Sequence, residues 1–165
     1  MKIRCWYIVY GKNDECPHPS QLHNSIRPAI TNLIYNCKPN EINWTNSQFT
    51  LSTTSVPVIT INRTTIGESQ FEDEVEKSIN AYATIQGEKY QEMIINHLRH
   101  TRQILHILPT GLSLGNAQLA RVCEQVCGFL ARETSGIIQV FQEGFFNPQG
   151  QSLMPHNPKH KLNTN

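Results

Sequence analysis

The last third of the chain constrains the fold more than any other stretch. An amphipathic helix is predicted over residues 116–132, and Gly136 then leads into an apolar strand at 137–141. Val122, Val126 and Leu130 recur at about one helical turn, whereas the strand is a short continuous apolar run. A turn-rich segment over 143–150 and a short return strand over 152–154 complete the pattern. This succession predicts a helix that leads into a central strand and then into a hairpin.

The first two thirds predict further strands and helices. Strands are expected at 3–10, 48–52, 56–62 and 104–108, and helices from near Ser25 to Ile34, from Ser69 to about Ile85, and over 88–100. The order predicts an α+β fold: one domain over residues 1–154, with a mixed sheet of about five to six strands and helices mainly on one face. Residues 155–165 are predicted to form a polar, disordered tail.

Composition and charge exclude several classes of function. A chain of 165 residues with a formal net charge of +1 has no strongly basic character, so nucleic-acid binding is not expected. No segment approaches the roughly 20 apolar residues that span a bilayer, and the N-terminus lacks a secretory signal pattern. The five cysteines are widely spread without a Cys-x-x-Cys pair, which argues against a disulfide framework. The sequence therefore predicts a soluble cytoplasmic protein.

Three histidines form the strongest candidate for a metal site. His97 and His100 are spaced i, i+3 on a predicted helix, and His106 lies on the strand that follows. Two imidazoles on one helix face and a third from a neighbouring strand could supply three ligands to a divalent metal. A structural interpretation is equally open, because His97 falls within the apolar stripe and could bond to the backbone or to a tyrosine hydroxyl.

The cysteines suggest two further hypotheses. Cys123 and Cys127 lie one helical turn apart, so they could share a metal or act in thiol redox chemistry. Both also lie on or near the apolar stripe of their helix, where a buried cysteine behaves as a small hydrophobic residue. A second set offers four potential zinc ligands, although their spacing matches no zinc-finger template: Cys16, His18, His23 and Cys37.

Two adjacent aromatic residues are candidates for contact with a ligand or a partner. Phe145 and Phe146 follow Gly144 at the end of a predicted strand, and Trp6 and Trp44 offer further contact surface. Neighbouring residues in a strand point to opposite faces, however. One of the two phenylalanine rings is therefore expected to enter the core, while the other stays partly exposed.

Two groups of residues could bind an anion. Arg99, Arg102 and Arg121, flanked by histidines, form a short basic cluster that could bind an anion, although arginines near a helix C-terminus also complement the helix dipole. The loop before the last helix is glycine-rich and precedes a helix N-terminus, where backbone amides are free to bind an anion. Its candidate residues are Gly111, Ser113, Gly115 and Asn116.

The C-terminal half also invites a comparison with other proteins. Strand 104–108, the helix that ends at Arg132, the segment 136–140 and the sequence Glu143-Gly144-Phe145-Phe146 stand in this order. Over residues 90–154 this arrangement resembles small uncharacterised bacterial α+β proteins. Those proteins often have an aspartate shortly before the Glu-Gly-Phe segment, whereas this chain has Phe141-Gln142 there. The resemblance implies no activity.

No nucleotide-binding or nucleophile-elbow motif is present, and the only aspartates are Asp14 and Asp73. We therefore expect a bacterial cytoplasmic protein-interaction or small-ligand-binding module without catalysis and without a cofactor. Its partner is expected to be a second copy of itself or another protein. The alternative is a metal-dependent enzyme or metal-binding protein that uses His97, His100 and His106.

Overall fold

The computed structural model describes residues 7–26, 28, 33–36, 44, 47–51, 57–85, 89–109 and 116–155. Eight strands and four helices follow one another along these residues: β1 (Tyr7–Gly11), α1 (Pro19–Ile26), β2 (Leu33–Asn36), β3 (Ser47–Leu51), β4 (Pro57–Thr65), α2 (Ser69–Ala83), α3 (Gln91–Arg99), β5 (Gln103–Pro109), α4 (Asn116–Glu133), β6 (Ile137–Val140), β7 (Gly144–Phe146) and β8 (Ser152–Pro155). The predicted α+β class is confirmed. The tail was predicted to begin at residue 155, but Pro155 is the last residue of β8, and residues 156–165 lie outside the described residues.

All eight strands form one sheet in the order β2-β3-β4-β5-β1-β6-β7-β8. Every neighbouring pair is antiparallel, so the prediction of a mixed sheet with five to six strands is wrong in both respects. The two strands that the sequence did not reveal, β2 and β7, are only four and three residues long. The first strand of the chain lies inside the sheet, where β1 pairs with both β5 and β6.

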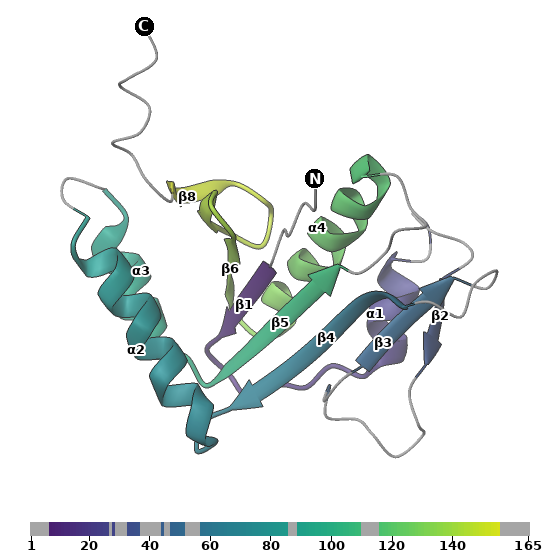
Figure 1. The fold of residues 1–165 in the computed structure, drawn as a ribbon, viewed down its shortest axis with the longest axis horizontal. Coiled ribbons are helices and arrows are strands. Elements are labelled where there is room, and N and C mark those ends of the chain that lie inside the picture. The colour runs from purple at the N-terminus through teal and green to yellow at the C-terminus, as the bar shows by residue number, and fades with distance from the viewer. Residues whose placement is uncertain are drawn as a thin grey trace, which may run out of the picture.

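Helices cover both faces of this sheet, so the prediction that they pack mainly on one face is also wrong. Figure 1 shows α2 and α3 as a pair on one side of the sheet, while α1 and α4 lie on the other. Tyr7 and Val9 of β1 belong to the core cluster that contains α1 and α4. Tyr10 belongs to the cluster that contains α2 and α3, with Ile8 packed against it. A strand with apolar residues on both faces reads as a continuous apolar run, which explains its sequence.

The stripe on α4 was predicted correctly from the sequence. Val122, Val126 and Leu130 are buried along one side of α4, and Cys123 and Cys127 are buried beside them. The helix ends at Glu133 and Gly136 follows, where a Cβ atom would lie 2.8 Å from the backbone oxygen of Tyr10. Only glycine allows the end of α4 to approach β1 so closely.

The first helix differs most from the prediction. A helix was expected to begin near Ser25 and to continue through Ile34, but α1 ends at Ile26 and residues 33–36 form strand β2. Pro28 disfavours a helical conformation in the residue before it, so it lies just after the end of the helix rather than in its first turn. Leu33 and Tyr35 then pair with Leu51 and Phe49 in the sheet.

Of the two predicted hairpins, one is confirmed. Strands β3 and β4 pair in antiparallel fashion with a register shift between Phe49 and Thr50, and Pro57 begins β4 as expected for a proline at a strand end. The segment 143–150 was expected to turn from the strand at 137–141 into the return strand, but it contains β7, which pairs with both β6 and β8. The turn at 147–150 therefore connects β7 to β8, with the Gly150 amide donating to the Asn147 carbonyl oxygen at 2.9 Å. None of the helices in the described part of the chain is long and apolar enough to cross a membrane.

Candidate functional site

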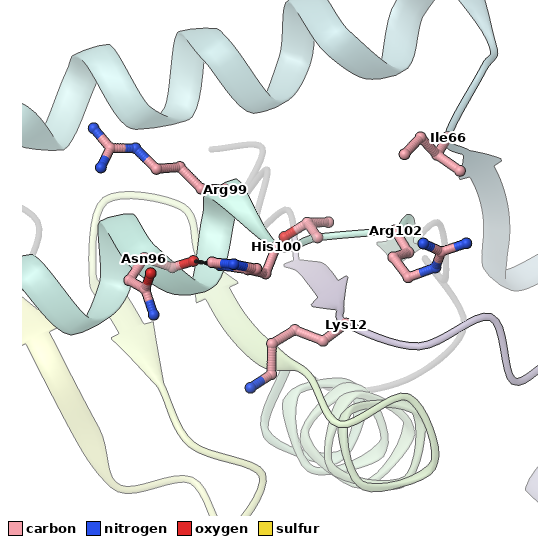
Figure 2. A pocket seen from close by; sticks show the side chains of 7 residues that line it. Lys12, Ile66, Asn96, Arg99, His100 and Arg102 are labelled. Atoms are coloured by element: carbon pink, nitrogen blue, oxygen red, sulfur yellow. Dashed lines mark hydrogen bonds between the residues drawn. The ribbon is translucent and has the colours of Figure 1, made fainter.

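An open cavity of about 610 Å³ lies where the ends of β1 and α3 meet the beginning of β5. Its lining combines basic and uncharged side chains: Lys12, Ile66, Asn96, Arg99, His100, Thr101 and Arg102. We call this the basic cavity. Figure 2 shows that Lys12, Arg99 and Arg102 extend from three different segments, with their charged ends directed away from one another. The charges therefore lie around a rim and do not converge on a single point.

Backbone hydrogen bonds join the ends of three strands at the basic cavity. The Arg102 amide donates to the Gly11 carbonyl oxygen at 2.8 Å, and the Ile66 amide donates to the Arg102 carbonyl oxygen at 2.9 Å. These two bonds connect the end of β1, the start of β5 and the end of β4. Lys12 follows Gly11 directly, so its position beside Arg102 is a consequence of the antiparallel pairing of β1 with β5.

The C-terminus of α3 forms one wall of the basic cavity. His100 caps the helix, and its amide donates to the carbonyl oxygen of His97 at 3.1 Å. Thr101 donates its amide to Leu98 and its hydroxyl to His97. The last carbonyl groups of the helix are thereby occupied, which reduces the negative charge that an approaching anion would meet.

Only one carboxylate has a described ion pair at this cavity. The Asp14 carboxylate contacts Arg102 Nη2 at 2.7 Å and accepts a hydrogen bond from Arg102 Nε at 2.8 Å. This hydrogen bond lowers the pKa of Asp14 and raises that of Arg102. Within the described ranges, Lys12 and Arg99 have no ion-pair partner, and both side chains are exposed. Two of the cations are thus available to a ligand, while the third is shared with Asp14.

His97 lies between the basic cavity and the core. Its Nε2 atom donates to the Tyr10 carbonyl oxygen at 2.9 Å, so the interpretation of a half-buried, backbone-bonded histidine fits its environment. Burial lowers the pKa of His97, its hydrogen bond to the Tyr10 carbonyl oxygen partly opposes this shift, and the nearby Lys12 and His100 add smaller contributions that lower the pKa.

The three predicted histidine ligands are not brought together. His100 Nδ1 bonds to the Asn96 carbonyl oxygen at 2.8 Å on its own helix, whereas His106 bonds through Nε2 to Glu74 of α2. Among the residues that the structure describes, no group of three His, Cys, Asp or Glu side chains could hold a metal ion. The expected three-histidine metal site is therefore not formed.

The predicted aromatic patch is divided between two cores. Phe145 is 0% exposed, with its ring centroid 4.7 Å from that of Tyr82 in an edge-on arrangement, so it is not a surface contact. Phe146 packs on the opposite side of the sheet, against the core of α1 and α4. Gly144 is buried and has a φ of 117°, a conformation that favours glycine. Trp44 is also fully buried, and Trp6 lies outside the described residues.

The cysteine hypotheses receive no support from the geometry. Cys123 and Cys127 are both buried in the core, and burial raises the pKa of Cys127 well above its usual value. A buried thiol of raised pKa is a poor nucleophile. Cys16 is half-buried, and His18 bonds locally to Ser20 through Nδ1 at 2.7 Å. Cys37 lies outside the described residues.

The glycine-rich anion loop falls largely outside the described residues. Gly111, Ser113 and Gly115 are not described. Asn116 is the first residue of α4, and its side chain is not described either. Of the two anion sites predicted from the sequence, the Arg99 and Arg102 pair is the one whose surroundings the structure shows. Arg99 and Arg102 line the basic cavity, whereas Arg121, the third arginine of the predicted cluster, lies on α4 and does not join them.

Sequence reasoning missed Lys12 and Asn96 at this cavity, and it missed a polar network beneath α2. There the Tyr10 hydroxyl donates to Gln139 Oε1 at 2.9 Å and lies 2.7 Å from Ser78 Oγ, while Gln139 Nε2 donates to the Tyr82 hydroxyl at 3.2 Å. The available signal for Lys12 was its position directly after a buried strand. No sequence pattern indicated which basic residues it would join.

Comparison with known proteins found no matching family model, no matching curated protein and no matching solved structure. The resemblance of residues 90–154 to small bacterial α+β proteins therefore stays a prediction. The arguments about function that follow depend on the geometry of the chain alone.

Proposed function

We propose that this protein is a binding module that recognises acidic groups of another molecule at the basic cavity. The observation that carries this proposal is that Lys12, Arg99 and Arg102, from three segments of the chain, line the rim of one open cavity. Arg99 alone could be explained as a cation near the C-terminus of a helix, which complements the helix dipole. Lys12 and Arg102 lie outside that helix, so the dipole does not account for them.

The electrostatic environment supports the same proposal. Lys12 and Arg99 are exposed cations without a described ion pair, and the positive charge of Lys12 helps to lower the pKa of the neighbouring His97. Carboxylates and phosphates form charge-assisted hydrogen bonds with arginine and lysine. The net charge of +1 favours a local anion site over a broad nucleic-acid-binding face. A bacterial source, a cytoplasmic location and self-association stay predictions.

The proposal is tested by nuclear magnetic resonance titration of the full chain with citrate and with pyrophosphate at low salt. Backbone signals of Lys12, His100 and Arg102 should shift together with added anion, and the shifts should diminish with salt, because salt screens exposed charges. Reversing two charges in the double variant Lys12→Glu, Arg99→Glu should weaken binding by about tenfold or more.

Arg121→Glu provides a matched control, because Arg121 is an exposed arginine of α4 on the opposite face of the sheet. This variant should keep its affinity for both anions. An equal loss in Arg121→Glu and in the single variant Lys12→Glu or Arg99→Glu, which change the net charge by the same amount, would show attraction by overall charge and would contradict a local site. A local site would also be contradicted if the backbone signals of Lys12, His100 and Arg102 did not shift when citrate or pyrophosphate is added.

A further inference from the structure

A second open cavity adjoins the basic cavity along α3. It has a volume of about 670 Å³, and it shares Asn96 and Arg99 with the basic cavity. Its lining includes the aliphatic side chains of Ala83, Met93 and Ile95. We call this the Met93 cavity. The two cavities therefore offer a ligand a cationic part and an apolar part at adjacent positions on one helix.

Exposed apolar side chains accompany both cavities. Ile66 is 49% exposed at the basic cavity, and Met93 is 46% exposed at the Met93 cavity. Single exposed hydrophobic residues are common on protein surfaces and need no explanation. Here they lie beside cations, because Ile66 shares its cavity with Lys12 and Met93 shares its cavity with Arg99. A methionine at a binding surface also adapts readily to partners of different shape.

From this arrangement we infer that the partner is an acidic peptide segment that carries apolar side chains, an inference that rests on the proposed anion-binding function. Charge complementarity favours several carboxylates along a chain over one compact anion, because the charged ends of Lys12, Arg99 and Arg102 point away from one another (Figure 2). Apolar side chains between those carboxylates would contact Met93 and Ile66. Recognition of acidic motifs by clusters of basic residues is a recurring mode of peptide binding.

Nucleic acid fits the same surface less well. Strong binding to a phosphate backbone usually requires many phosphate contacts, whereas Arg102 at this cavity is already paired with Asp14. The lining of the Met93 cavity contains Glu92 as well as Lys89, so it adds no further net positive charge beyond Arg99. Single-stranded nucleic acids also require aromatic side chains on which bases can stack, and Met93, Ile95 and Ala83 are aliphatic.

The experiment compares three fluorescently labelled peptides of equal length in anisotropy titrations with the full chain. One alternates Glu with Leu, the second alternates Glu with Ser, and the third alternates Lys with Leu. The Glu and Leu peptide should bind about tenfold tighter than the Glu and Ser peptide, because burial of leucine side chains adds to the attraction between charges. The Lys and Leu peptide should not bind measurably.

Substitution of exposed apolar residues assigns the effect to this surface. Met93→Asn and Ile66→Asn should each weaken binding of the Glu and Leu peptide, while leaving the signal shifts caused by pyrophosphate unchanged. Phe141→Asn is the control, since Phe141 is 52% exposed and borders neither cavity. All three positions are exposed, so none of the variants is expected to impair folding.

Different failures have different meanings. Equal affinity for the Glu and Leu and the Glu and Ser peptides, with pyrophosphate still bound, would overturn the inference and leave the anion site standing. Loss of all anion and peptide binding would overturn both. Tighter binding of a single-stranded oligonucleotide, or a dimer in light scattering that Arg99→Glu abolishes, would assign the surface to another occupant and overturn the peptide inference.

Discussion

The polar groups beneath α2 and the charges around the basic cavity serve different purposes, although both regions are built on β1. Beneath α2, the Tyr10 hydroxyl bonds to Gln139 and Ser78, and His106 bonds to Glu74. At the basic cavity, two residues along the chain from Tyr10, Lys12 is exposed to solvent without an ion pair among the described residues. Polar groups that satisfy one another inside a fold stabilise and orient it. Charges that the protein leaves to solvent are available to a ligand.

This comparison gives two separable classes of effect. Changes beneath α2 should alter the free energy of unfolding and leave anion binding in place. Changes at the basic cavity should do the reverse. A variant that alters both quantities to a similar extent would show that the two regions are coupled.

The largest effect is expected for Phe145→Ala. Phe145 is fully buried between Tyr10 and Tyr82, so its removal leaves a cavity in the core under α2. The free energy of unfolding in urea should fall by about 3–5 kcal/mol. Phe141→Ala, at an exposed position, should change it by less than about 0.5 kcal/mol. If the two variants lost equal stability, the assignment of Phe145 to the core would be wrong.

A smaller loss of stability is expected for Tyr10→Phe. This change keeps the ring beside Phe145 and removes only the hydroxyl, which leaves Gln139 Oε1 without its donor. Gln139 is half-buried, so water can partly replace the lost donor, and the expected loss is about 0.5–1.5 kcal/mol. Urea denaturation measures the loss, and Tyr90→Phe, at an exposed position, serves as the control. Unchanged stability in Tyr10→Phe would mean that the network beneath α2 contributes little.

The elements that the sequence predicted correctly are those whose apolar residues follow one clear period. The buried stripe of α4 and the hairpin of β3 and β4 are examples. Strand β2 was mistaken for helix because Ile30, Leu33 and Ile34 also suit a helical spacing, and a four-residue strand is too short to establish alternation. The placement of helices on both faces was missed. The apolar run of β1 shows that this strand is buried, but it does not show which helices cover each face of the sheet.

The candidate site was predicted only where its residues are close in sequence. Arg99 and Arg102 are three positions apart, and both line the basic cavity. Lys12 joins them through the pairing of β1 with β5, which no local pattern reveals. The histidines illustrate the reverse case. His97 and His100 share a helix with suitable spacing, but each bonds to a different backbone carbonyl group, so spacing alone did not produce a metal site.

His97 connects the two regions, and its titration tests how sharply they are separated. Its pKa in the folded protein is lowered below the usual 6.5, mainly by burial, with smaller contributions from Lys12 and His100, while its hydrogen bond to the Tyr10 carbonyl oxygen partly opposes the shift. The unfolded chain therefore binds the proton more tightly than the folded chain does. The stability that neutral His97 contributes is fully present above about pH 6.5, and it is lost as the pH falls from there towards the lowered pKa.

Two variants check this assignment. In His97→Asn, the free energy of unfolding should fall less between about pH 7 and about pH 5 than in the unchanged protein. In Lys12→Met, the pKa of His97 measured by nuclear magnetic resonance should rise, because one positive charge near the ring is removed. If the pKa of His97 does not change in Lys12→Met, the charges of the basic cavity do not influence His97, and the basic cavity and the network beneath α2 are electrostatically independent.

The smallest effect is expected for Asp14→Asn, and it has the opposite sign to the charge reversals. The Asp14 carboxylate holds Arg102 at 2.7 Å, so its neutralisation releases a third cation at the basic cavity. Affinity for citrate should rise by roughly twofold to fivefold, since an exposed ion pair contributes little and its loss frees only one more cation. Calorimetric titration measures the gain, and Asp73→Asn on α2 controls for the change in net charge. Weaker binding in Asp14→Asn would mean that Asp14 positions Arg102 for the ligand, so the carboxylate would belong to the site and would not compete with it.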